Sequence, residues 1–436
     1  MNGEFVGTWA VDRASHRFVY DPAWLQSPRR RALSLSLPIT ATREIRGEVV
    51  ANYFDNLLPD NQKIRERVAR RYRARSTDAF ALLQAIGRDC VGAVQLLPDG
   101  QAPQGWDRIE RKPLTEAQVA DILRAVPSEV VLGQHGDDDL LRISLAGAQE
   151  KTALLYSRKR WYRPQGATPT THILKLPLGL VGGSRRIDLA DSVENEWLCA
   201  RILHHLDLPV AETEIALFED QKVLAVRRFD RSWQRSVDGG EWIARLPQED
   251  FCQAMGYPPD KKYESHGGPG MAECLRLLQG SADPDDRETF AITQLTFWLL
   301  AATDGHAKNF SIFLEAGDAF ITTPLYDVIS AWPYIGDRGD QIRWRKAALA
   351  MALRAKNAHY ALHTVHARHW QTLAMRSGGT TVWRRMLRHV EAVETALAGV
   401  ESELPDGFPP HTWDAISKGM RRQVQHFMAG TTELKA

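Results

Sequence analysis

The sequence predicts a two-lobed α+β fold in which a strand-rich part is followed by a helical part. Strand signals separated by turns continue up to Phe229, whereas the chain from Leu246 onward has mostly helical periodicity. Lys175 lies within an apolar strand of the first part, and Asp304 and Asn309 follow a long helix of the second. With 436 residues the chain is longer than one hydrophobic core usually serves, so we expect two or three domains.

The composition is that of an ordinary soluble protein, with 44% hydrophobic and 25% charged residues and a formal net charge of +1. This balance gives no overall preference for nucleic acid or membrane. The four cysteines are scattered and form no C-x-x-C pair, which argues against a zinc site or a disulfide framework. The N-terminus lacks the apolar segment of a signal peptide, and the most apolar run, 292–302, is too short to span a bilayer. We therefore expect a cytoplasmic protein with no membrane partner.

The N-terminal domain, placed at residues 1–135, has the pattern of a small α/β module. Its predicted elements are a hairpin at 5–11 and 16–20, strands at 32–37 and within GRDCVGAVQLLP (87–98), a helix ending at 54–58, and helices at 78–86 and 115–125. Residues 63–75 carry seven basic side chains against one acid, Glu66. A solvated helix face is the favoured interpretation of this stretch, and a patch for phosphate backbone or an acidic partner is the alternative.

The second domain, placed at 136–250, begins with a strand at 140–145, a loop of small residues and a return strand. This layout is typical of a hairpin that covers nucleotide phosphates. The loop residues are Ala146, Gly147, Ala148, Gln149, Glu150 and Lys151. With only one glycine the loop is a poor match to a glycine-rich loop, and the absence of G-x-x-x-x-G-K-[ST] argues against a Walker-type NTPase.

Lys175 follows in the apolar strand THILKLP. A buried ammonium is costly unless it meets an anion, and nucleotide phosphates with a helix glutamate would supply one. Glu196, 21 residues later in a predicted helix at 193–206, is the candidate glutamate. An edge lysine that extends to water is the alternative. Two strands are expected at 214–218 and 223–229, and the second ends in RRFDR, where backbone groups could hold the edge of an adenine.

The third domain, placed at 251–436, is predicted to be helical, with a long helix at 284–303 and four or five helices between 345 and 427. Asp304 follows the long helix, Asn309 comes five residues later, and Asp327 lies beyond an apolar hairpin. In protein kinases an aspartate, an asparagine five positions on and a second aspartate serve as base and magnesium ligands. Turn-forming residues without a catalytic role are the alternative for each.

The order of these features, together with nine longer motifs, resembles the HipA-type serine/threonine kinase toxins of bacterial HipBA modules. The motifs are FDNLLPD, IGRDCVGAVQLLP, ISLAGAQEKTALL, TPTTHILKLP, RFDR, RLPQEDFCQ, KYESHGGPG, ATDGHAKNFSIF and PLYDVISAWP. The resemblance covers nearly the whole chain. It implies a protein kinase-like two-lobed fold with an extra N-terminal α/β subdomain and an all-helical C-terminal lobe.

The resemblance also implies ATP and Mg²⁺ as cofactors and assigns residue roles. Asp304 would be the catalytic base and Lys175 the phosphate-binding lysine. Asn309 and Asp327 would be the metal ligands, with His306 and residues 146–151 beside the phosphates. Arg227 and Phe229 would bind adenine through their backbone, although the position of Arg227 is often acidic in the family. Ser144 would be the site of autophosphorylation. In isolation, Ser144 could be an ordinary strand-end serine, His306 a turn residue, and Asp230 a cap or a partner of Arg228 or Arg231.

By the same resemblance, the expected partners are a HipB-like helix-turn-helix antitoxin dimer and, mainly through it, operator DNA. The expected substrate is an aminoacyl-tRNA synthetase, most of all glutamyl-tRNA synthetase, whose phosphorylation slows translation and induces dormancy. Autophosphorylation would inactivate the kinase. A catalytically weak corepressor bound to a DNA-binding antitoxin is the alternative, and a small-molecule or lipid kinase is a third hypothesis. Turnover of ATP distinguishes the first two.

Overall fold

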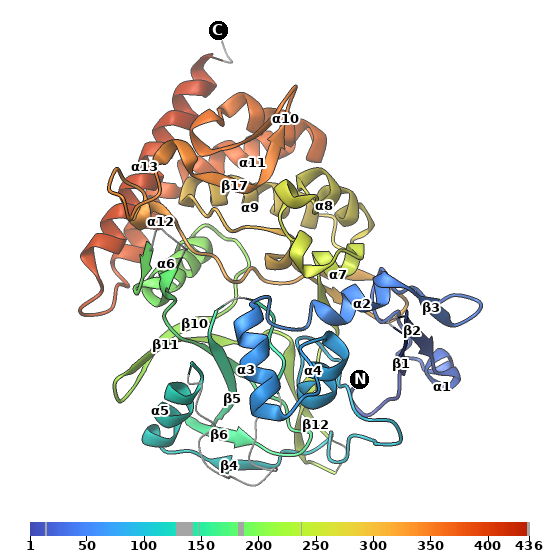
Figure 1. Ribbon diagram of the computed structural model, residues 1–436. Coiled ribbons are helices and arrows are strands. Elements are labelled where there is room, and N and C mark those ends of the chain that lie inside the picture. The colour runs from blue at the N-terminus through green and yellow to red at the C-terminus, as the bar shows by residue number, and fades with distance from the viewer. Residues whose placement is uncertain (14, 128–142, 148, 182–186, 237, 434–436) are drawn as a thin grey trace. The chain divides into compact units, whose positions relative to one another are not determined.

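The computed structural model describes residues 1–13, 15–127, 143–147, 149–181, 187–236 and 238–433. They form two compact units that alternate along the chain (Figure 1). The first unit comprises Met1–Leu176, Ala216–Lys261 and Ser311–Ile321, and the second comprises Pro177–Ile215, Lys262–Phe310 and Thr322–Ala436. Our division into three domains stays a prediction, and its first boundary lies outside the described residues.

The first unit holds most of the described strands. Those wholly or partly within it are β1 (Gly7–Asp12), β2 (Ser15–Tyr20), β3 (Glu44–Arg46), β4 (Arg111–Pro113), β5 (Lys151–Ser157), β6 (Arg160–Pro164), β7 (His172–Lys175), β10 (Thr213–Phe218), β11 (Gln221–Arg227), β12 (Arg231–Arg235), β13 (Glu241–Arg245), β14 (Gln248–Asp250), β15 (Ser311–Leu314) and β16 (Phe320–Thr322). Its helices are α1 (Pro22–Gln26), α2 (Glu48–Asp55), α3 (Gln62–Tyr72), α4 (Ala79–Ile86), α5 (Glu116–Ala125), α7 (Phe251–Met255) and the 3₁₀ turn η2 (Pro259–Lys261).

Most predicted elements of the first unit are confirmed, because their local signals are strong. The hairpin β1–β2 pairs from Gly7↔Tyr20 to Asp12↔Ser15. Helix α4 begins at its cap Asp78, whose carboxylate accepts from the Ala81 N–H. Helix α5 begins with a capping box of Thr115 and Gln118.

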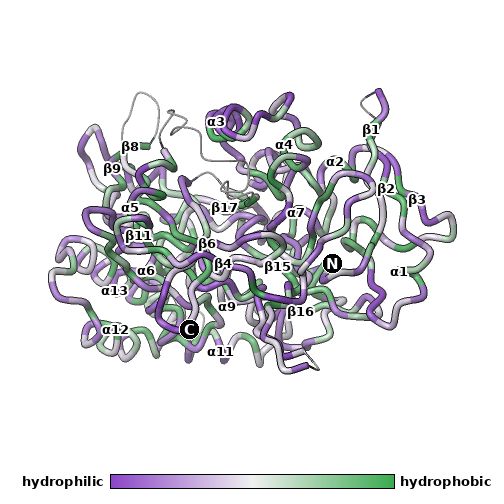
Figure 2. The backbone as a smooth tube through the Cα atoms, turned by 90° about the horizontal axis from the view of Figure 1, so that it is seen from below, coloured by the Kyte–Doolittle hydropathy of each residue, from purple (hydrophilic) through white to green (hydrophobic). Residues whose placement is uncertain are grey.

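The central sheet of the first unit has the strand order β10-β11-β7-β5-β6-β4. Strand β7 is therefore an inner strand, paired antiparallel to both β11 and β5. Helix α5 packs on this sheet through Val119 and Leu123, which share a core with Leu154, Leu174 and Val223. Hydrophobic and hydrophilic colours alternate along the helices in Figure 2, as expected for elements with one buried face.

The predicted strand at 140–145 lies outside the described residues up to 142, and residues 143–145 make only the isolated bridge of Ile143 with Asp89. Two other strand predictions in the first unit are wrong. Residues 32–37 make only the isolated bridge Ser34↔Leu37, because side chains take up the neighbouring backbone groups: the Leu35 N–H donates to Glu249 Oε1 at 2.9 Å. Residues 88–98 form no strand, because the segment loops around a cluster of buried arginines that the Cys90 and Gly92 carbonyls satisfy. In both places tertiary contacts outweigh the apolar pattern.

The second unit is mainly helical, as predicted. Its helices are α6 (Ser192–His205), α8 (Met271–Leu277), α9 (Asp286–Leu300), α10 (Ala367–Ser377), α11 (Thr380–Glu391), α12 (Val393–Glu401) and α13 (Pro410–Glu433). The 3₁₀ turns are η3 (Glu264–His266), η4 (Leu278–Gly280), η5 (Ala307–Asn309), η6 (Trp332–Tyr334), η7 (Trp344–Lys346) and η8 (Leu362–Thr364). The described part also contains the strand pairs β8 (Gly179–Val181) with β9 (Ile187–Leu189) and β17 (Ala348–Arg354) with β18 (Ala358–Ala361).

The β17–β18 pair corrects the expectation that this C-terminal region is entirely helical. The segment ALAMALR consists of good helix formers, so local propensity favours a helix. Residues Leu349 to Leu353 are nevertheless all buried, and the strand pairs with β18. The helix propensity of these residues is outweighed, because a run of apolar residues also suits a strand that is buried on both faces. Among the described residues, no helix is long and apolar enough to cross a membrane.

We predict that Glu249→Gln changes the pH dependence of stability. Burial raises the pKa of Glu249 to about 8, and its Oε2 lacks a hydrogen-bond partner among the described residues. Because the folded pKa exceeds the unfolded value, the contribution of Glu249 is fully present below about pH 4.5 and is lost as pH rises toward 8. Between pH 5 and pH 7 the free energy of unfolding should fall by about 2 kcal/mol more in the native protein than in the variant.

Urea unfolding of both proteins at pH 5, 6, 7 and 8 measures this difference. Glu241→Gln, which changes a partly exposed glutamate of β13, is the matched control and should leave the pH profile unchanged. Parallel stability profiles for Glu249→Gln and the native protein would show that the carboxyl is ionised in the folded state.

Candidate active site

Asp304 lies in the turn that follows α9 in the second unit. The helix ends because Ala301 adopts the left-handed conformation, with φ 50°, and its N–H caps the last turn. Gly305 is needed next to Asp304, since a Cβ there would lie 2.4 Å from the buried Phe297 ring. The Asp304 side chain is 61% exposed, so its carboxylate faces solvent at the end of a buried helix.

Asn309 and Asp327 meet in the second unit, although 17 residues separate them in the chain. The Asn309 Nδ2 donates to the Asp327 backbone carbonyl at 3.0 Å, and the Asn309 side chain is buried. Because this bond fixes the amide nitrogen, the amide oxygen points the other way and can serve as a ligand. Asp327 has φ 61°, a left-handed conformation that aspartate tolerates better than most residues and that often occurs at functional sites.

The two loops that carry Asp304 and Asp327 are held to each other and to α9. The Tyr326 hydroxyl donates to the Lys308 carbonyl at 2.8 Å. The Ser330 hydroxyl donates to the Leu300 carbonyl at 2.5 Å, and the Ala331 N–H donates to the Ala301 carbonyl at 3.0 Å. Hydrogen bonds to backbone carbonyls of this kind fix the separation of the loops, which preorganises the polar groups between them.

His306, two residues after Asp304, is buried. Burial and the nearby Lys262 lower its pKa to about 3, so the imidazole is neutral at physiological pH. Its Nε2 lies 4.0 Å from Asp304 Oδ1, and its Nδ1 lacks a hydrogen-bond partner among the described residues. A neutral imidazole with an available ring nitrogen can donate to an oxyanion without adding charge.

Tyr263 is a residue of this site that sequence reasoning missed. Its hydroxyl donates to Asp304 Oδ1, and its ring lies edge-on to the His306 ring at 4.8 Å between centroids. The bond orients the carboxylate. The motif KYESHGGPG contains this tyrosine, but it lies 41 residues before Asp304, and no spacing rule connects the two.

In the first unit, Lys175 lies at the end of the inner strand β7 and is buried, as the sequence predicted for a strand lysine. It is paired in register with Leu224 of β11 and with Lys151 of β5. Two lysines on adjacent inner strands place cationic groups at one end of the sheet. Glu196 lies on α6 of the second unit and is also buried.

The predicted phosphate loop lies just before β5. Gly147 has φ 102°, and a Cβ there would lie 2.7 Å from the Lys151 ammonium. The Gln149 amide donates to the Leu176 carbonyl at 2.6 Å, and Glu150 forms an ion pair with Arg67 of α3. Ala146 is half-buried, whereas Ala148 lies outside the described residues. The described part of the loop is therefore folded against β7 and α3.

Ser144 is fully buried in this arrangement. Its hydroxyl donates to the Leu57 carbonyl at 2.7 Å, and its N–H donates to the Asp89 carbonyl at 3.1 Å. Gly147 continues the contact by forming a parallel bridge with Pro59. The hydroxyl of Ser144 is thus inaccessible to any phosphoryl donor unless the segment leaves its place.

The segment 227–230, which begins at the last residue of β11, has two faces. Arg227 is exposed and Phe229 is half-buried, whereas Arg228 and Asp230 are only 4% exposed. The Asp230 carboxylate pairs with Arg228 at 2.8 Å and with Arg231 at 2.9 Å. Of the alternatives for Asp230, an arginine partner is therefore the one that the structure supports.

Comparison with known proteins decides the family. The model of the HipA-like C-terminal domain matches residues 143–400, and that of the HipA N-terminal domain matches residues 1–123. The chain belongs to the HipA family. The first match alone covers more than half of the chain, and the two matches together span most of it.

Curated relatives of this HipA-family chain are named as kinases. It is 34% identical over 416 residues to a Sinorhizobium fredii protein named Putative kinase Y4mE, covering 93% of this chain and 91% of the relative. It is 26% identical over 343 residues to the Shewanella oneidensis serine/threonine-protein kinase toxin HipA, covering 76% and 73% of the two chains. The chain is therefore a HipA-type serine/threonine-protein kinase.

The fold of this HipA-family chain is also that of a solved relative. It superposes with a TM-score of 0.78 and 23% identity on a chain of the Shewanella oneidensis complex of HipA, HipB and operator DNA, covering 99% of this chain and 98% of that one. At this identity the match shows the fold alone. It confirms the predicted α+β class and the expected family fold.

We predict that Tyr263→Phe lowers the turnover number for phosphoryl transfer by about tenfold, or about 1.4 kcal/mol. The variant removes the hydrogen bond that orients the Asp304 carboxylate and leaves the ring in place. KM for ATP should change little, because the phenylalanine ring keeps the contact with His306 and only the hydroxyl is lost. Steady-state kinetics with Tyr162→Phe of β6 as control measures both constants. An unchanged turnover number would exclude an orienting role for Tyr263.

Proposed function

We propose that this HipA-type kinase transfers the γ-phosphoryl group of ATP to a serine or threonine hydroxyl of a protein substrate, with Asp304 as the general base. The observation that carries the proposal is the pair of pinned loops in the second unit, with the exposed Asp304 and the Asn309–Asp327 contact between them. Phosphoryl transfer depends mainly on positioning and electrostatic stabilisation, so preorganised loops of this kind suit it.

The residues fit a magnesium ion. Asn309 offers an amide oxygen and Asp327 a carboxylate, and magnesium prefers oxygen ligands completed by water and phosphate oxygens. When bound, Mg²⁺–ATP supplies the phosphoryl group and the charge neutralisation that its transfer requires. Lys175 and Lys151 would hold the phosphates together with the N–H groups of residues 146–151. His306 would donate to a phosphate oxygen, and the backbone of Arg227 and Phe229 would hold the adenine.

We further propose that the kinase is the toxin of a toxin–antitoxin module in the cytoplasm. Its substrate would be an aminoacyl-tRNA synthetase, glutamyl-tRNA synthetase foremost, and its effect an arrest of translation with dormancy. Its partner would be a HipB-like helix-turn-helix antitoxin, which would recruit it to operator DNA. Two findings on Shewanella oneidensis HipA support this proposal, since that protein is named a kinase toxin and a structure of it contains HipB and operator DNA.

The second candidate function is that of a corepressor with little catalysis, bound to operator DNA through an antitoxin. The operator complex of the Shewanella oneidensis relative favours it as an additional role. The two functions differ in whether they need the base and the metal ligands. A corepressor would act without them.

We predict that Asp304→Asn and Asp327→Asn each reduce phosphoryl transfer by at least a thousandfold. The first variant removes the base and the second a metal ligand, groups that are each worth several kcal/mol of transition-state stabilisation. Both side chains are outside the cores, so the melting temperature should stay within a few degrees. The measurement is transfer of labelled γ-phosphate to the protein itself and to purified glutamyl-tRNA synthetase.

Asp340→Asn, at an exposed aspartate of the second unit, is the matched control and should retain full activity. Expression of the native chain alone should arrest bacterial growth, and either catalytic variant should not. Growth arrest by the Asp304→Asn variant would instead favour a toxicity that does not depend on catalysis.

We also predict that the kinase modifies Ser144 and that the modified form binds ATP at least tenfold more weakly, about 1.4 kcal/mol. A phosphate adds about −1.5 to −2 charges and needs room and cations. The Ser144 hydroxyl is buried, so there is no room for a phosphate, and the neighbouring Leu57 carbonyl oxygen would repel the anion. Phosphorylation should therefore keep residues 143–147 out of their folded position, which turns the kinase off.

Mass spectrometry after incubation with ATP and magnesium, followed by nucleotide titration, tests the two parts of this prediction. Ser144→Ala should abolish the modification, whereas Ser157→Ala of β5 should not. Phosphate found only at other residues, or full ATP affinity with Ser144 modified, would refute the mechanism.

A further inference from the structure

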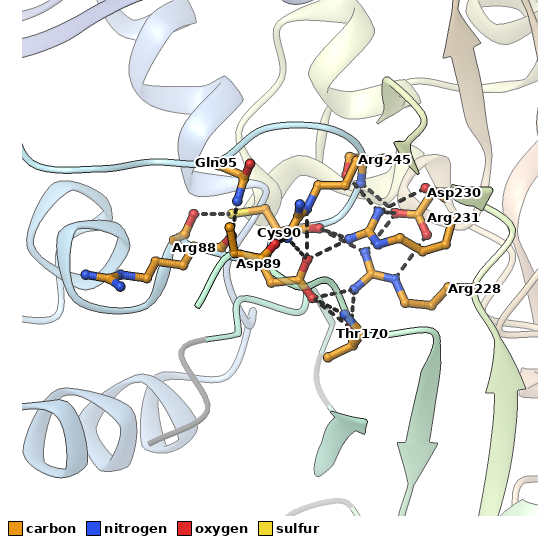
Figure 3. A network of polar contacts seen from close by, with 12 residues as sticks. Arg88, Asp89, Cys90, Gln95, Thr170, Arg228, Asp230, Arg231 and Arg245 are labelled. Carbon is orange, nitrogen blue, oxygen red and sulfur yellow. Dashed lines mark hydrogen bonds and ion pairs between the residues drawn. The ribbon is translucent and has the colours of Figure 1, made fainter. Parts of the chain in front are cut away.

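The segment that we assign to the adenine base is anchored by its alternate side chains. Arg228 and Asp230 lie between and beside the two predicted base-binding residues and point into a buried polar cluster (Figure 3). The cluster also contains Asp89, Arg231 and Arg245, and all of its members belong to the first unit. Any shift of the cluster therefore moves the backbone on which the base would rest.

Both the side chains and the backbone of this segment are bonded. Arg228 makes a two-pronged contact with Asp230, with Nε to Oδ1 at 3.0 Å and Nη2 to Oδ2 at 2.8 Å. Its backbone N–H donates to the Thr171 carbonyl at 2.9 Å, and the Asp230 carbonyl accepts from the Leu246 N–H at 2.9 Å. Planar, charge-assisted contacts of this kind restrict orientation as well as distance.

Asp89 is the carboxylate that joins the three guanidinium groups. Its oxygens lie 2.9 Å from Arg231, 3.2 Å from Arg245 and 3.4 Å from Arg228. Thr170 adds two bonds to Asp89 Oδ2, from its hydroxyl at 2.7 Å and its N–H at 3.1 Å. With three arginines and two aspartates the cluster has a formal charge of +1, so without Asp89 only Asp230 would oppose the three cations.

Asp89 belongs to the HipA N-terminal domain match, whereas Arg228 belongs to the C-terminal domain match. The turn after Asp89 closes on the same cluster. The Gly92 N–H donates to Asp230 Oδ2 at 2.8 Å, and the Gly92 carbonyl accepts from Arg231 at 2.9 Å. Gly92 has φ 74°, and a Cβ there would lie 2.7 Å from the Gln248 carbonyl oxygen, so only glycine fits.

We propose that Asp89 is a positioning residue for nucleotide recognition: through Arg228 and Asp230 it sets the backbone of 227–229 for the adenine base. This inference rests on the proposed ATP-dependent function. It gives the N-terminal domain an indirect part in base selectivity. Because recognition by backbone groups tolerates displacements of only about 0.5 Å, loosening the cluster weakens the base contact first.

The test uses Asp89→Asn in the full-length protein. The amide keeps the shape of the carboxylate but loses its charge. The expected result is a rise in KM for ATP of at least tenfold, with the turnover number at saturating ATP within threefold of the native value. The preference for ATP over GTP should fall. Inhibition by magnesium tripolyphosphate, which has phosphates but no base, should be unchanged.

Asp55→Asn is the matched control, because it breaks an ion pair with Arg65 in the same N-terminal region without touching the cluster. It should leave all four measurements unchanged. If Asp89→Asn does not fold, Thr170→Val carries the test, since it removes one bond to Asp89 and one to Arg228. A threefold or larger rise in KM for ATP, again without effect on tripolyphosphate, is then expected.

Two results would overturn the inference. One is an equal loss of affinity for ATP and for tripolyphosphate, which indicates general loosening of the fold. The other is an unchanged KM for ATP in whichever variant is folded. Failure of the proposed function is distinct from both, because it would appear in the native protein as an absence of phosphoryl transfer from ATP.

Discussion

The buried ion cluster around Asp89 is the constraint on which the first unit depends. Five charged side chains from 89, 228–231 and 245 are almost fully removed from water, and each ion loses several kcal/mol of solvation. Such a cluster is tolerated only when nearly every donor and acceptor is satisfied, and the Cys90 carbonyl and Thr170 hydroxyl complete the set. Burial by itself raises the pKa of Asp89, but the three arginines reverse this and hold it well below its ordinary value.

This requirement explains local features that propensity does not. The chain at 88–98 gives up strand pairing because its carbonyls are needed by arginines. Position 92 requires glycine, because its backbone is left-handed and a Cβ would strike the Gln248 backbone. The burial of Arg228, Asp230 and Arg231 follows as well, since all three side chains are part of the cluster, whereas Phe229 is not and stays half-buried. One electrostatic requirement thus sets the conformation of three segments.

In the second unit, hydrogen bonds to backbone carbonyls hold the functional segments in place, instead of buried ion pairs. The polar groups of the site lie on two loops, and loops are mobile unless their backbone is bonded. Here side-chain hydroxyls of Tyr326 and Ser330 bond to backbone carbonyls at the end of α9 and in the adjoining turn. The buried helix supplies rigidity, and the exposed Asp304 at its end is the residue that we propose as the base. The Tyr263 hydroxyl adds orientation from a segment that is distant in the chain.

The sequence by itself determined the α+β class, the order of most elements, and the spacing of Asp304, Asn309 and Asp327. These features depend on local periodicity, capping residues such as Asp78 and Thr115, and short-range motifs, which a single chain displays directly. Only the tertiary structure decided that Tyr263 contacts Asp304, that Asp89 joins three arginines, and that ALAMALR is a strand. Tyr263 and Asp89 contact partners that are remote in sequence, and ALAMALR is buried on both faces. The free energy of such contacts exceeds the few tenths of a kcal/mol by which local propensities differ.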